Sequence, residues 1–382
     1  MRVLFVFGTR PEAIKLAPVI RELAARPEFV CRICVTGQHR EMLAQFLGLF
    51  ELQPDWNLEV MRPDQDLAYL TAAVLSGVSG VLDRWRPERV IVQGDTTSTF
   101  AAALAAFYHK IPVAHVEAGL RTGDIAAPWP EEANRLLVAR IADLHFAPTP
   151  RARDNLLREG VDQARIAVTG NTGIDALLWV SERVETRPEL RARVDSMLGG
   201  RFADRRLILM TGHRRESFGG GLERIAAAIA RIAARPDVAI IFPVHPNPKV
   251  RRATKPLRRQ ENILLIEPVD YPELVYLLKR CYIVVTDSGG IQEEAPSFGK
   301  PVLVTRETTE RPEAMEQGLA RLVGTDERRL FDAISELLDD PQAYRRMSRI
   351  ANPYGDGQAS RRVAERLSPQ RIGADGIAIS RR

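Results

Sequence analysis

Short apolar runs alternate with longer stretches in which apolar residues recur every three or four positions along most of the chain. This alternation is typical of strand–helix units whose strands form parallel sheets. In the first half it predicts strands at 3–7, 29–35, 89–93, 112–117, 144–148 and 165–170, with helices near 12–25, 40–49, 66–85, 97–109, 131–142 and 151–159. In the second half it predicts strands at 206–212, 238–244, 262–269, 282–288 and 300–305, with helices near 220–234, 271–279, 290–298 and 326–339.

The strand signal is weakest and the charge is densest between residues 181 and 205. We interpret this segment as a linker or hinge between two doubly wound α/β halves, an organisation that the length of 382 residues also favours. The expected domains are an N-terminal Rossmann-like domain at 1–170 and a C-terminal one at 171–355. Ligands of such sheets bind beyond the carboxyl ends of the strands, so the catalytic and binding residues are expected there.

Composition excludes several classes of protein. Hydrophobic residues make up 45% and charged residues 27%, as in an average globular domain. No apolar run approaches the roughly 20 residues that span a bilayer, and the N-terminal MRVLFVFGTRPEA lacks the features of a signal peptide, so we expect a cytoplasmic protein without membrane contact. Cys31 and Cys34 lie on a predicted strand, where positions three apart face opposite sides, and no second pair completes a metal site.

The net charge of +5 is concentrated at one end of the chain. Residues 361–382 contain six arginines and two acidic residues, so the preceding 360 residues carry a balance of only +1. We interpret the end of the chain, 369–382, as a solvated basic tail and expect no nucleic-acid partner.

Glycines and cations follow two of the predicted strands. After the first strand, Gly8 and a predicted helix start provide free backbone N–H groups for an anion, with Arg10 and Lys15 as cationic donors. After the strand at 282–288, Ser288, Gly289 and Gly290 open the next helix in a way that suits a diphosphate, and Glu294 one turn later suits ribose hydroxyls. An ordinary strand-to-helix turn remains the alternative in both places. The first turn lacks the G-x-G-x-x-G pattern, so a nicotinamide cofactor is not indicated.

Three carboxylates of the first half, Asp95, Glu117 and Glu131, lie at or just after predicted strand ends or helix starts. Taken singly, Asp95 suits a helix N-cap, and Glu131 suits a first-turn charge paired with Arg135. Three acids at neighbouring strand ends of one sheet favour a shared acid/base site instead.

Two histidines follow strands of the second half. His213 precedes two arginines in TGHRRESFG and suits a phosphate, and His245 ends the strand at 238–244. The other histidines singled out, His109, His115 and His145, have no such setting and are expected to be structural.

These segments together resemble the non-hydrolysing UDP-N-acetylglucosamine 2-epimerases of bacteria, from residue 2 to about 366. The motifs that carry the resemblance are FGTRPEAIKLAP, GQHREML, GDTTSTFAAALAAF, HVEAGLRTGD, PWPEEANR, GNTGIDAL, TGHRRESFG, PVHPNP, TDSGGIQEEAPSFGKPVLVTRETTERPEA and NPYGDGQAS. The resemblance implies a glycosyltransferase-B-like fold of two Rossmann-like domains, with residues 356–368 packing back on the first. It also implies a homodimer without metal or nicotinamide, and interconversion of UDP-GlcNAc and UDP-ManNAc.

Carried over by position, the resemblance assigns roles to individual residues. The UDP contacts are Ser288, Gly289, Gly290, Glu294 and Arg311, with Leu274 in the uridine pocket where relatives commonly have Phe. The remaining nucleotide-sugar positions are Arg10, Lys15, Asp95, Glu117 and His213, and Glu131 matches the third catalytic acid. Positions for a second, activating UDP-GlcNAc are Gln38, His39, Arg214 and His245. Glu41 and Asp64 depart from residues found in some activated members.

The chemistry explains why acids are needed. The proton on carbon 2 is not next to a carbonyl, so the bond from carbon 1 to UDP must break early in an anti elimination that gives 2-acetamidoglucal. UDP then adds back while a proton returns to the opposite face. We assign Asp95 and Glu131 as the proton-transfer pair, with Glu117 assisting or positioning. Alternatives are a 2-epimerase of a related UDP-diacetamido sugar, a UDP-sugar glycosyltransferase of the same fold, a hydrolysing epimerase, and a binding protein without turnover.

Overall fold

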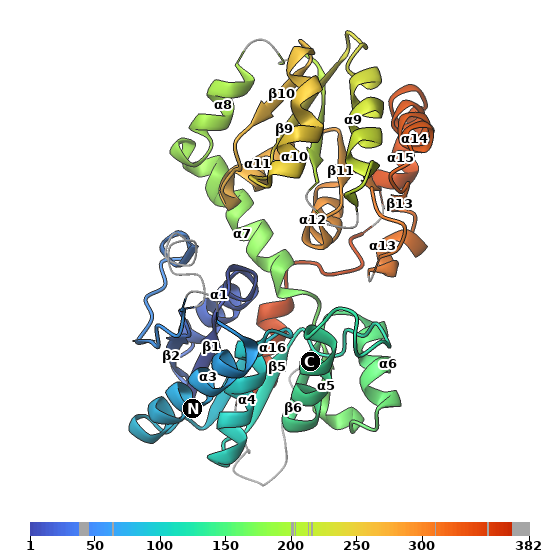
Figure 1. Ribbon diagram of the computed structural model, residues 1–382. Helices are drawn as coiled ribbons and strands as arrows, with labels where there is room; N and C mark the ends of the chain where they lie inside the picture. Colours follow the sequence, from blue (N-terminus) through green and yellow to red (C-terminus); the bar gives the residue numbers. More distant parts are fainter. Residues whose placement is uncertain are drawn as a thin grey trace. The chain divides into compact units, whose positions relative to one another are not determined.

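The computed structural model describes residues 1–37, 46–62, 65–199, 202, 204–212, 214, 217–309, 311–349 and 351–368. The chain divides into two compact units (Figure 1). Unit 1 contains Met1–Ala176 and the chain from Gly357 onward, and unit 2 contains Leu177–Asp356. The division falls inside helix α7 (Thr172–Thr186), and the segment predicted as a linker at 181–205 belongs to unit 2. That segment is largely helical, because its charged residues alternate with buried Val184, Val194 and Leu198.

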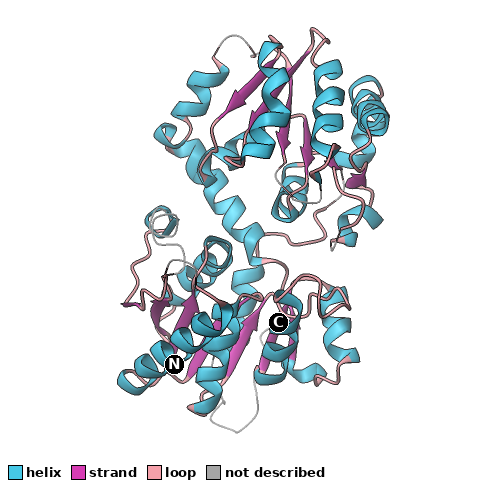
Figure 2. Ribbon diagram, viewed as in Figure 1, coloured by secondary structure: helices cyan, strands magenta, loops and turns pink. Residues whose placement is uncertain are grey.

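Unit 1 is built on a seven-stranded sheet in which all the neighbouring strands run parallel (Figure 2). The strand order is β3-β2-β1-β4-β5-β6-β7. The strands are β1 (Arg2–Phe7), β2 (Val30–Val35), β3 (Trp56–Asn57), β4 (Arg89–Gln93), β5 (Val113–Val116), β6 (Leu144–Ala147) and β7 (Ile166–Val168). All six predicted strands of this half are present. The two-residue β3 was missed, because two residues are too few to show a pattern.

The helices of unit 1 agree closely with the predicted positions. They are α1 (Arg10–Ala24), α3 (Leu67–Arg84), α4 (Thr97–Tyr108), α5 (Glu131–Ile141) and α6 (Pro150–Arg158), with a 3₁₀ turn η1 (Gln163–Arg165). Of the helix predicted at 40–49, residues 46–49 are helical and 40–45 lie outside the described residues. The core between α3, α4 and the sheet includes Leu4, Val78, Val92 and Cys34. Burial raises the pKa of the Cys34 thiol to about 12, so the C-x-x-C pair is part of the hydrophobic structure.

The last helix of the described chain, α16 (Ala359–Leu367), packs against α1. Its first two backbone N–H groups, those of Ala359 and Ser360, donate to the carboxylate of Asp175 at 3.2 and 2.7 Å. Arg362 donates to the carbonyl oxygen of Thr169 at 3.0 Å. An acceptor from α7 thus satisfies N–H groups that a helix start leaves without partners of its own. These contacts fix α16 on unit 1 although unit 2 separates the two in sequence.

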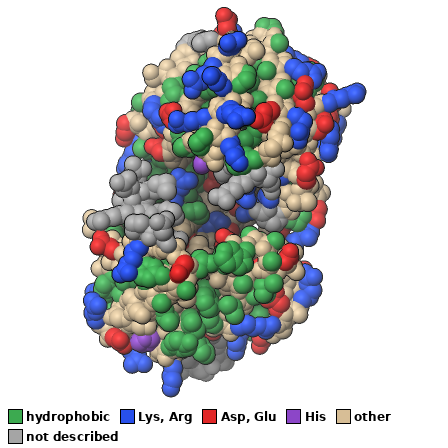
Figure 3. Space-filling model, viewed as in Figure 1, with side chains coloured by type: hydrophobic (Ala, Val, Ile, Leu, Met, Phe, Trp, Pro, Cys, Tyr) green, Lys and Arg blue, Asp and Glu red, His purple; other side chains and the backbone are tan. Residues whose placement is uncertain are grey.

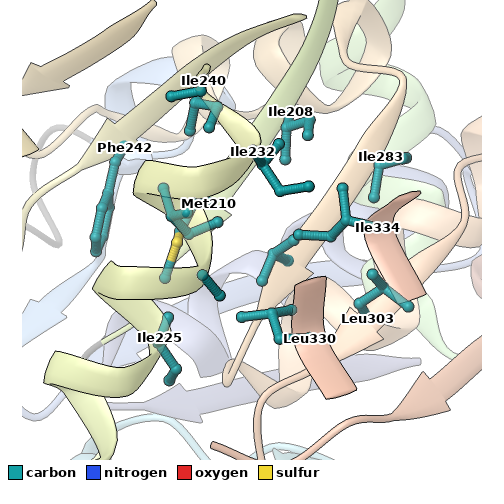
Figure 4. Close-up of a cluster of buried hydrophobic side chains, with 14 of the residues drawn as sticks. Ile208, Met210, Ile225, Ile232, Ile240, Phe242, Ile283, Leu303, Leu330 and Ile334 are labelled. Atoms are coloured by element: carbon teal, nitrogen blue, oxygen red, sulfur yellow. The ribbon is translucent and has the colours of Figure 1, made fainter. Parts of the chain in front are cut away.

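Unit 2 contains a six-stranded parallel sheet of order β10-β9-β8-β11-β12-β13. Its strands are β8 (Arg206–Thr211), β9 (Val238–Pro243), β10 (Ile263–Ile266), β11 (Ile283–Thr286), β12 (Val302–Val304) and β13 (Ala320–Leu322). The first five were predicted, and the three-residue β13 was not. Figure 4 shows part of the core, where Ile225 and Ile232 of one helix and Leu330 and Ile334 of another meet strand residues such as Ile208.

The helices of unit 2 include more short segments than the sequence predicted. The predicted helices correspond to α9 (Gly221–Ile232), α11 (Tyr271–Arg280), α12 (Gly289–Glu294) continued by the 3₁₀ turn η5 (Ala295–Phe298), and α14 (Glu327–Asp339). Segments that were not predicted are η2 (Pro188–Leu190), α8 (Ala192–Leu198), α10 (Pro248–Thr254), η4 (Lys255–Arg259), α13 (Pro312–Glu316) and α15 (Pro341–Ser348). Most of them span eight residues or fewer and begin at or next to a proline, so their apolar period is short.

Within the described residues, no helix combines the length and the apolar character needed to cross a membrane. In the same residues, His, Cys, Asp and Glu side chains form no cluster of three or more that could hold a metal ion.

Candidate active site

The turn after β1 is held in place by a buried carboxylate. Glu12, which is 1% exposed, accepts backbone N–H groups of Gly8 at 3.1 Å and Thr9 at 2.7 Å. Its second oxygen accepts the hydroxyls of Thr96 and Thr99 at 2.8 Å each. One side chain therefore joins the start of α1 to the start of α4. The sequence analysis missed Glu12, although T-x-x-E at a helix start is the signature of a capping box.

Lys15 of α1 and Glu117, the residue after β5, lie in contact. The Lys15 ammonium forms an ion pair with Glu117 Oε1, and the Gln93 amide donates to Glu117 Oε2. The Glu117 side chain is 8% exposed, and its backbone has a φ of +63°, a left-handed conformation that is uncommon outside glycine. Both oxygens of this carboxylate are thus engaged by neighbours. Gln93 is a second residue that the sequence analysis did not single out.

Asp95 lies at the end of β4, the strand next to β5. Its carboxylate pairs with the guanidinium of Arg135, and its carbonyl oxygen accepts the Asn134 amide at 2.9 Å. Asp95 is not the N-cap of α4, because Thr96 holds that position and its hydroxyl accepts Thr99 N–H at 3.1 Å. The alternative N-cap interpretation of Asp95 is therefore wrong.

Glu131 is the first residue of α5 and is half-buried. The alternative pairing of Glu131 with Arg135 is also wrong. Arg135 contacts Asp95 and, at 3.0 Å, Glu132 three residues before it. Glu132 is 1% exposed and also accepts backbone N–H groups of Thr122 and Gly123, at 3.2 Å and beyond, so it orders the loop after β5.

Of the histidines expected to be structural, His115 and His145 are buried, and His109 is partly exposed. His115 donates from Nε2 to the carbonyl oxygen of Gly94 at 2.7 Å, and its burial lowers its pKa to about 3. Burial likewise lowers the pKa of His145 to about 4. His109 lies 3.5 Å from Asp83 at the surface. Both buried rings are neutral at physiological pH, which agrees with a packing role.

In unit 2, the candidate diphosphate turn follows β11. Asp287, 1% exposed, accepts the backbone N–H of Arg214 at 2.7 Å and so links the ends of β8 and β11. A Cβ on Gly289 would lie 2.6 Å from the Arg311 guanidinium, whereas a Cβ on Gly290 would meet nothing within 4 Å. Arg311 donates to Glu293 at 2.6 Å. An alanine at 289 would therefore force the Arg311 guanidinium, which covers this position, to shift.

Three further predicted residues of unit 2, Glu294, Leu274 and His245, come from different parts of the chain. Glu294 ends α12 and accepts the Tyr271 hydroxyl at 3.0 Å, and Leu274 lies half-buried on α11, the helix that Tyr271 begins. Tyr271 was not predicted. His245 is exposed, and its Nδ1 accepts Asn247 N–H at 3.1 Å.

Two other predicted residues lie at helix starts. Arg10 is exposed at the first residue of α1, and Ser288 is the half-buried N-cap of α12. His213, Gln38 and His39 lie outside the described residues, as do Glu41 and Asp64.

In unit 1 the structure thus brings Asp95, Glu117 and Lys15 to one edge of a parallel sheet, and in unit 2 it places Gly289 against Arg311. The fold is α/β with two Rossmann-like units, of the glycosyltransferase-B-like type. A glycosyltransferase of kitacinnamycin shares it with a TM-score of 0.62 at 14% identity, over 95% of this chain and 97% of that one. That likeness is one of fold alone.

The comparisons with known proteins define the family. The UDP-N-acetylglucosamine 2-epimerase family model matches residues 21–368, and this chain belongs to that family. It is 54% identical to the UDP-N-acetylglucosamine 2-epimerase of Yersinia pestis over 97% of this chain and 100% of that protein. The crystal structure of the Neisseria meningitidis UDP-GlcNAc 2-epimerase bound to UDP-GlcNAc is similar with a TM-score of 0.87 and 46% identity, covering 96% of this chain and 99% of that one. The family predicted from the sequence motifs is confirmed.

Proposed function

We propose that this protein interconverts UDP-N-acetylglucosamine and UDP-N-acetylmannosamine by eliminating UDP and adding it back. Relatives more than 50% identical carry the name of this activity along nearly their full length. The observation that carries the proposal for this chain is the pair of carboxylates at neighbouring strand ends, Asp95 after β4 and Glu117 after β5, each held by its own cation. Proton transfer at a sugar carbon requires acid/base groups held in fixed positions, and the carboxyl ends of parallel strands are where such sheets bind their ligands.

The different settings of the carboxylates divide their roles. Glu117 accepts from Lys15 and Gln93 through both oxygens and is nearly buried, so it positions Lys15 and contributes charge. Asp95 uses Oδ2 for Arg135, and among the described residues no hydrogen bond engages its Oδ1. Glu131 likewise forms no ion pair with any described residue. Asp95 and Glu131 are therefore the groups with oxygens available for a proton.

The reaction then follows from these roles. One carboxylate takes the proton from carbon 2 while the bond between carbon 1 and the UDP oxygen breaks, which leaves 2-acetamidoglucal and UDP. The second group, protonated at the outset, gives its proton to the other face of carbon 2 as the UDP oxygen re-forms its bond to carbon 1, so the two groups end with their protonation states exchanged. Each such group typically contributes roughly 10²–10⁴-fold to the rate. Arg10 and Arg311 supply positive charge for the diphosphate, a form of stabilisation that is usually the largest single contribution.

The UDP portion would be held by the turn after β11. Ser288, Gly289 and Gly290 start α12, and Arg311 lies over Gly289 with its charge fixed by Glu293. Glu294, oriented by Tyr271, accepts ribose hydroxyls, and Leu274 contributes apolar contact to the uracil. Arg214 and His245, with Gln38 and His39, are the positions we assign to a second UDP-GlcNAc that activates the enzyme.

A homodimer is part of the same proposal. Hydrophobic side chains gather on the face of unit 1 over α3 and α4 (Figure 3). Phe107 and Tyr108 are 57% and 63% exposed there, and they line a groove of about 570 Å³ with Ile111 and Ile141. Contiguous exposed apolar surface of this kind marks interaction sites, and a second copy is the partner that the family favours.

The test is incubation with UDP-GlcNAc in heavy water, followed by proton NMR. We expect UDP-ManNAc to appear and the signal of the proton on carbon 2 to disappear. Asp95→Asn and Glu131→Gln should each slow this exchange roughly 10²–10⁴-fold. Asp154→Asn, at an aspartate 52% exposed on α6, is the matched control and should leave the rate unchanged. Conversion without deuterium at carbon 2, or release of free ManNAc, would contradict the proposal.

A further inference from the structure

Arg135 is a buried cation that holds two carboxylates from different parts of unit 1. It is 9% exposed, and its two terminal nitrogens donate to Asp95 and, at 3.0 Å, to Glu132. Its Nε is buried and has no hydrogen-bond partner among the described residues. A guanidinium is suited to this bridge because its planar fork presents several donors in a fixed geometry, which a lysine ammonium cannot reproduce.

The N-terminal part of α5 holds Asp95 at two points. Arg135 binds its carboxylate, and Asn134, the preceding residue, donates to its carbonyl oxygen at 2.9 Å. Glu131 begins the same helix four positions before Arg135. Because a helical turn is rigid, the position of Asp95 is set relative to the helix that carries Glu131. The two proposed proton-transfer groups therefore share one support.

A proton must leave one face of carbon 2 and return to the other, so the separation and direction of the two carboxylates matter as much as their presence. The geometry points to Arg135 as a positioning residue of the reaction, one that fixes Asp95 relative to Glu131 without touching the sugar itself. The inference rests on the proposed function, because it gives Asp95 and Glu131 the roles stated above. It gives a role in the reaction to Arg135, which the sequence had suggested only as an ion-pair partner of Glu131.

A structural explanation is the competing one. Through Glu132, Arg135 also reaches the backbone N–H groups of Thr122 and Gly123, so removing it would disturb the loop after β5 as well. A positioning role and a loop-ordering role differ in one respect. Positioning acts through the Asp95 carboxylate and disappears when that carboxylate is absent, whereas loop disorder persists without it.

The experiment compares Arg135→Met and Arg135→Lys in the full chain, with kcat and KM for UDP-GlcNAc and deuterium incorporation at carbon 2. Arg140→Met is the matched control, since Arg140 lies on the same helix, is exposed and donates to the Glu159 carbonyl oxygen at 2.9 Å. Arg135→Met is then combined with Asp95→Asn, and residual exchange is followed over a day at high enzyme concentration. The wild type, the two single variants and the double variant form a double-mutant cycle, which measures whether the effects of the two substitutions on the rate are independent.

We expect Arg135→Met to lower kcat about 100-fold with KM changed less than about threefold, and Arg135→Lys to recover about tenfold. In the Asp95→Asn background, Arg135→Met should change the remaining rate less than about threefold. Arg140→Met should match the wild type. If Arg135→Met does not fold, Arg135→Lys carries the same comparison in both backgrounds.

Three results would overturn the inference: an unchanged kcat, a rise in KM alone, or an equal fall in both backgrounds. Failure of the proposed function is distinguishable from these, because it would appear as wild-type protein that neither exchanges the proton on carbon 2 nor forms UDP-ManNAc.

Discussion

Replacing Gly289 by alanine should displace the Arg311 guanidinium. The new Cβ would lie 2.6 Å from its Cζ and Nη1, so the group must move about 0.8 Å to reach the 3.4 Å of ordinary contact. Arg311 cannot move freely, because its side chain is only 16% exposed and donates at 2.6 Å to Glu293, which is 6% exposed. Weakening a hydrogen bond between charged groups of this kind costs about 1.5–3 kcal/mol.

Gly290→Ala provides the matched comparison for stability. It lies on the same turn, has negative φ like Gly289, and its new Cβ would meet nothing within 4 Å. Both substitutions gain the same helix propensity of up to about 1 kcal/mol, so the difference between them isolates the clash. For a unit of about 180 residues, 1 kcal/mol corresponds to about 2–4 °C, which predicts a Tm about 3–12 °C lower for Gly289→Ala.

Scanning calorimetry of the two variants measures this difference, and titration calorimetry with UDP adds a second readout. If Arg311 binds the diphosphate as proposed, the Kd of Gly289→Ala for UDP should rise at least about tenfold. Equal midpoints for the two variants, or a lower midpoint for Gly290→Ala, would refute the reasoning that the cation over Gly289 dictates the residue there.

Three further predictions follow from unit 1 and from the thiols. Asp175→Ala removes the acceptor for the first N–H groups of α16 and should lower the free energy of unfolding by about 1–2 kcal/mol. Hydrogen exchange in residues 360–367 should become faster, and Asp175→Asn should have a smaller effect. Unchanged exchange would contradict this prediction. Burial lowers the pKa of His115 to about 3 and of His145 to about 4, so the unfolded state binds more protons than the folded state below pH 6.5. The Tm should therefore fall as the pH drops from 6.5 to 4, and a Tm that does not change with pH would contradict this prediction. Burial raises the pKa of Cys34 and Cys281 to about 12 and of Cys31 to about 11, so iodoacetamide at pH 8 should label native protein far more slowly than denatured protein, as mass spectrometry can show.

The local pattern determined most of the elements that are long enough to show a period. Every predicted strand is present, because continuous apolar runs such as 3–7 and 283–286 can be satisfied only by burial on both sides of a parallel sheet. Most of the elements that were missed are short, although the 15-residue helix α7 was missed as well. β3 and β13 contain two and three residues, and α13 contains five, too few for any period to be read. The linker predicted at 181–205 was wrong because dense charge also covers the outer face of helices.

For the site, the sequence by itself determined which residues lie at strand ends, because order along the chain sets that, and its motifs determined the family. It did not determine which side chains meet. Arg135 pairs with Asp95 across 40 residues, Glu12 reaches Thr96 across 84, and α16 binds Asp175 across 184. Contacts at such separations leave no trace in a local period, so the i,i+4 spacing from Glu131 was a poor guide to the partner of Arg135. Only the packing of the sheet and its helices brings those groups within hydrogen-bond distance, and that packing decided how the carboxylates are held.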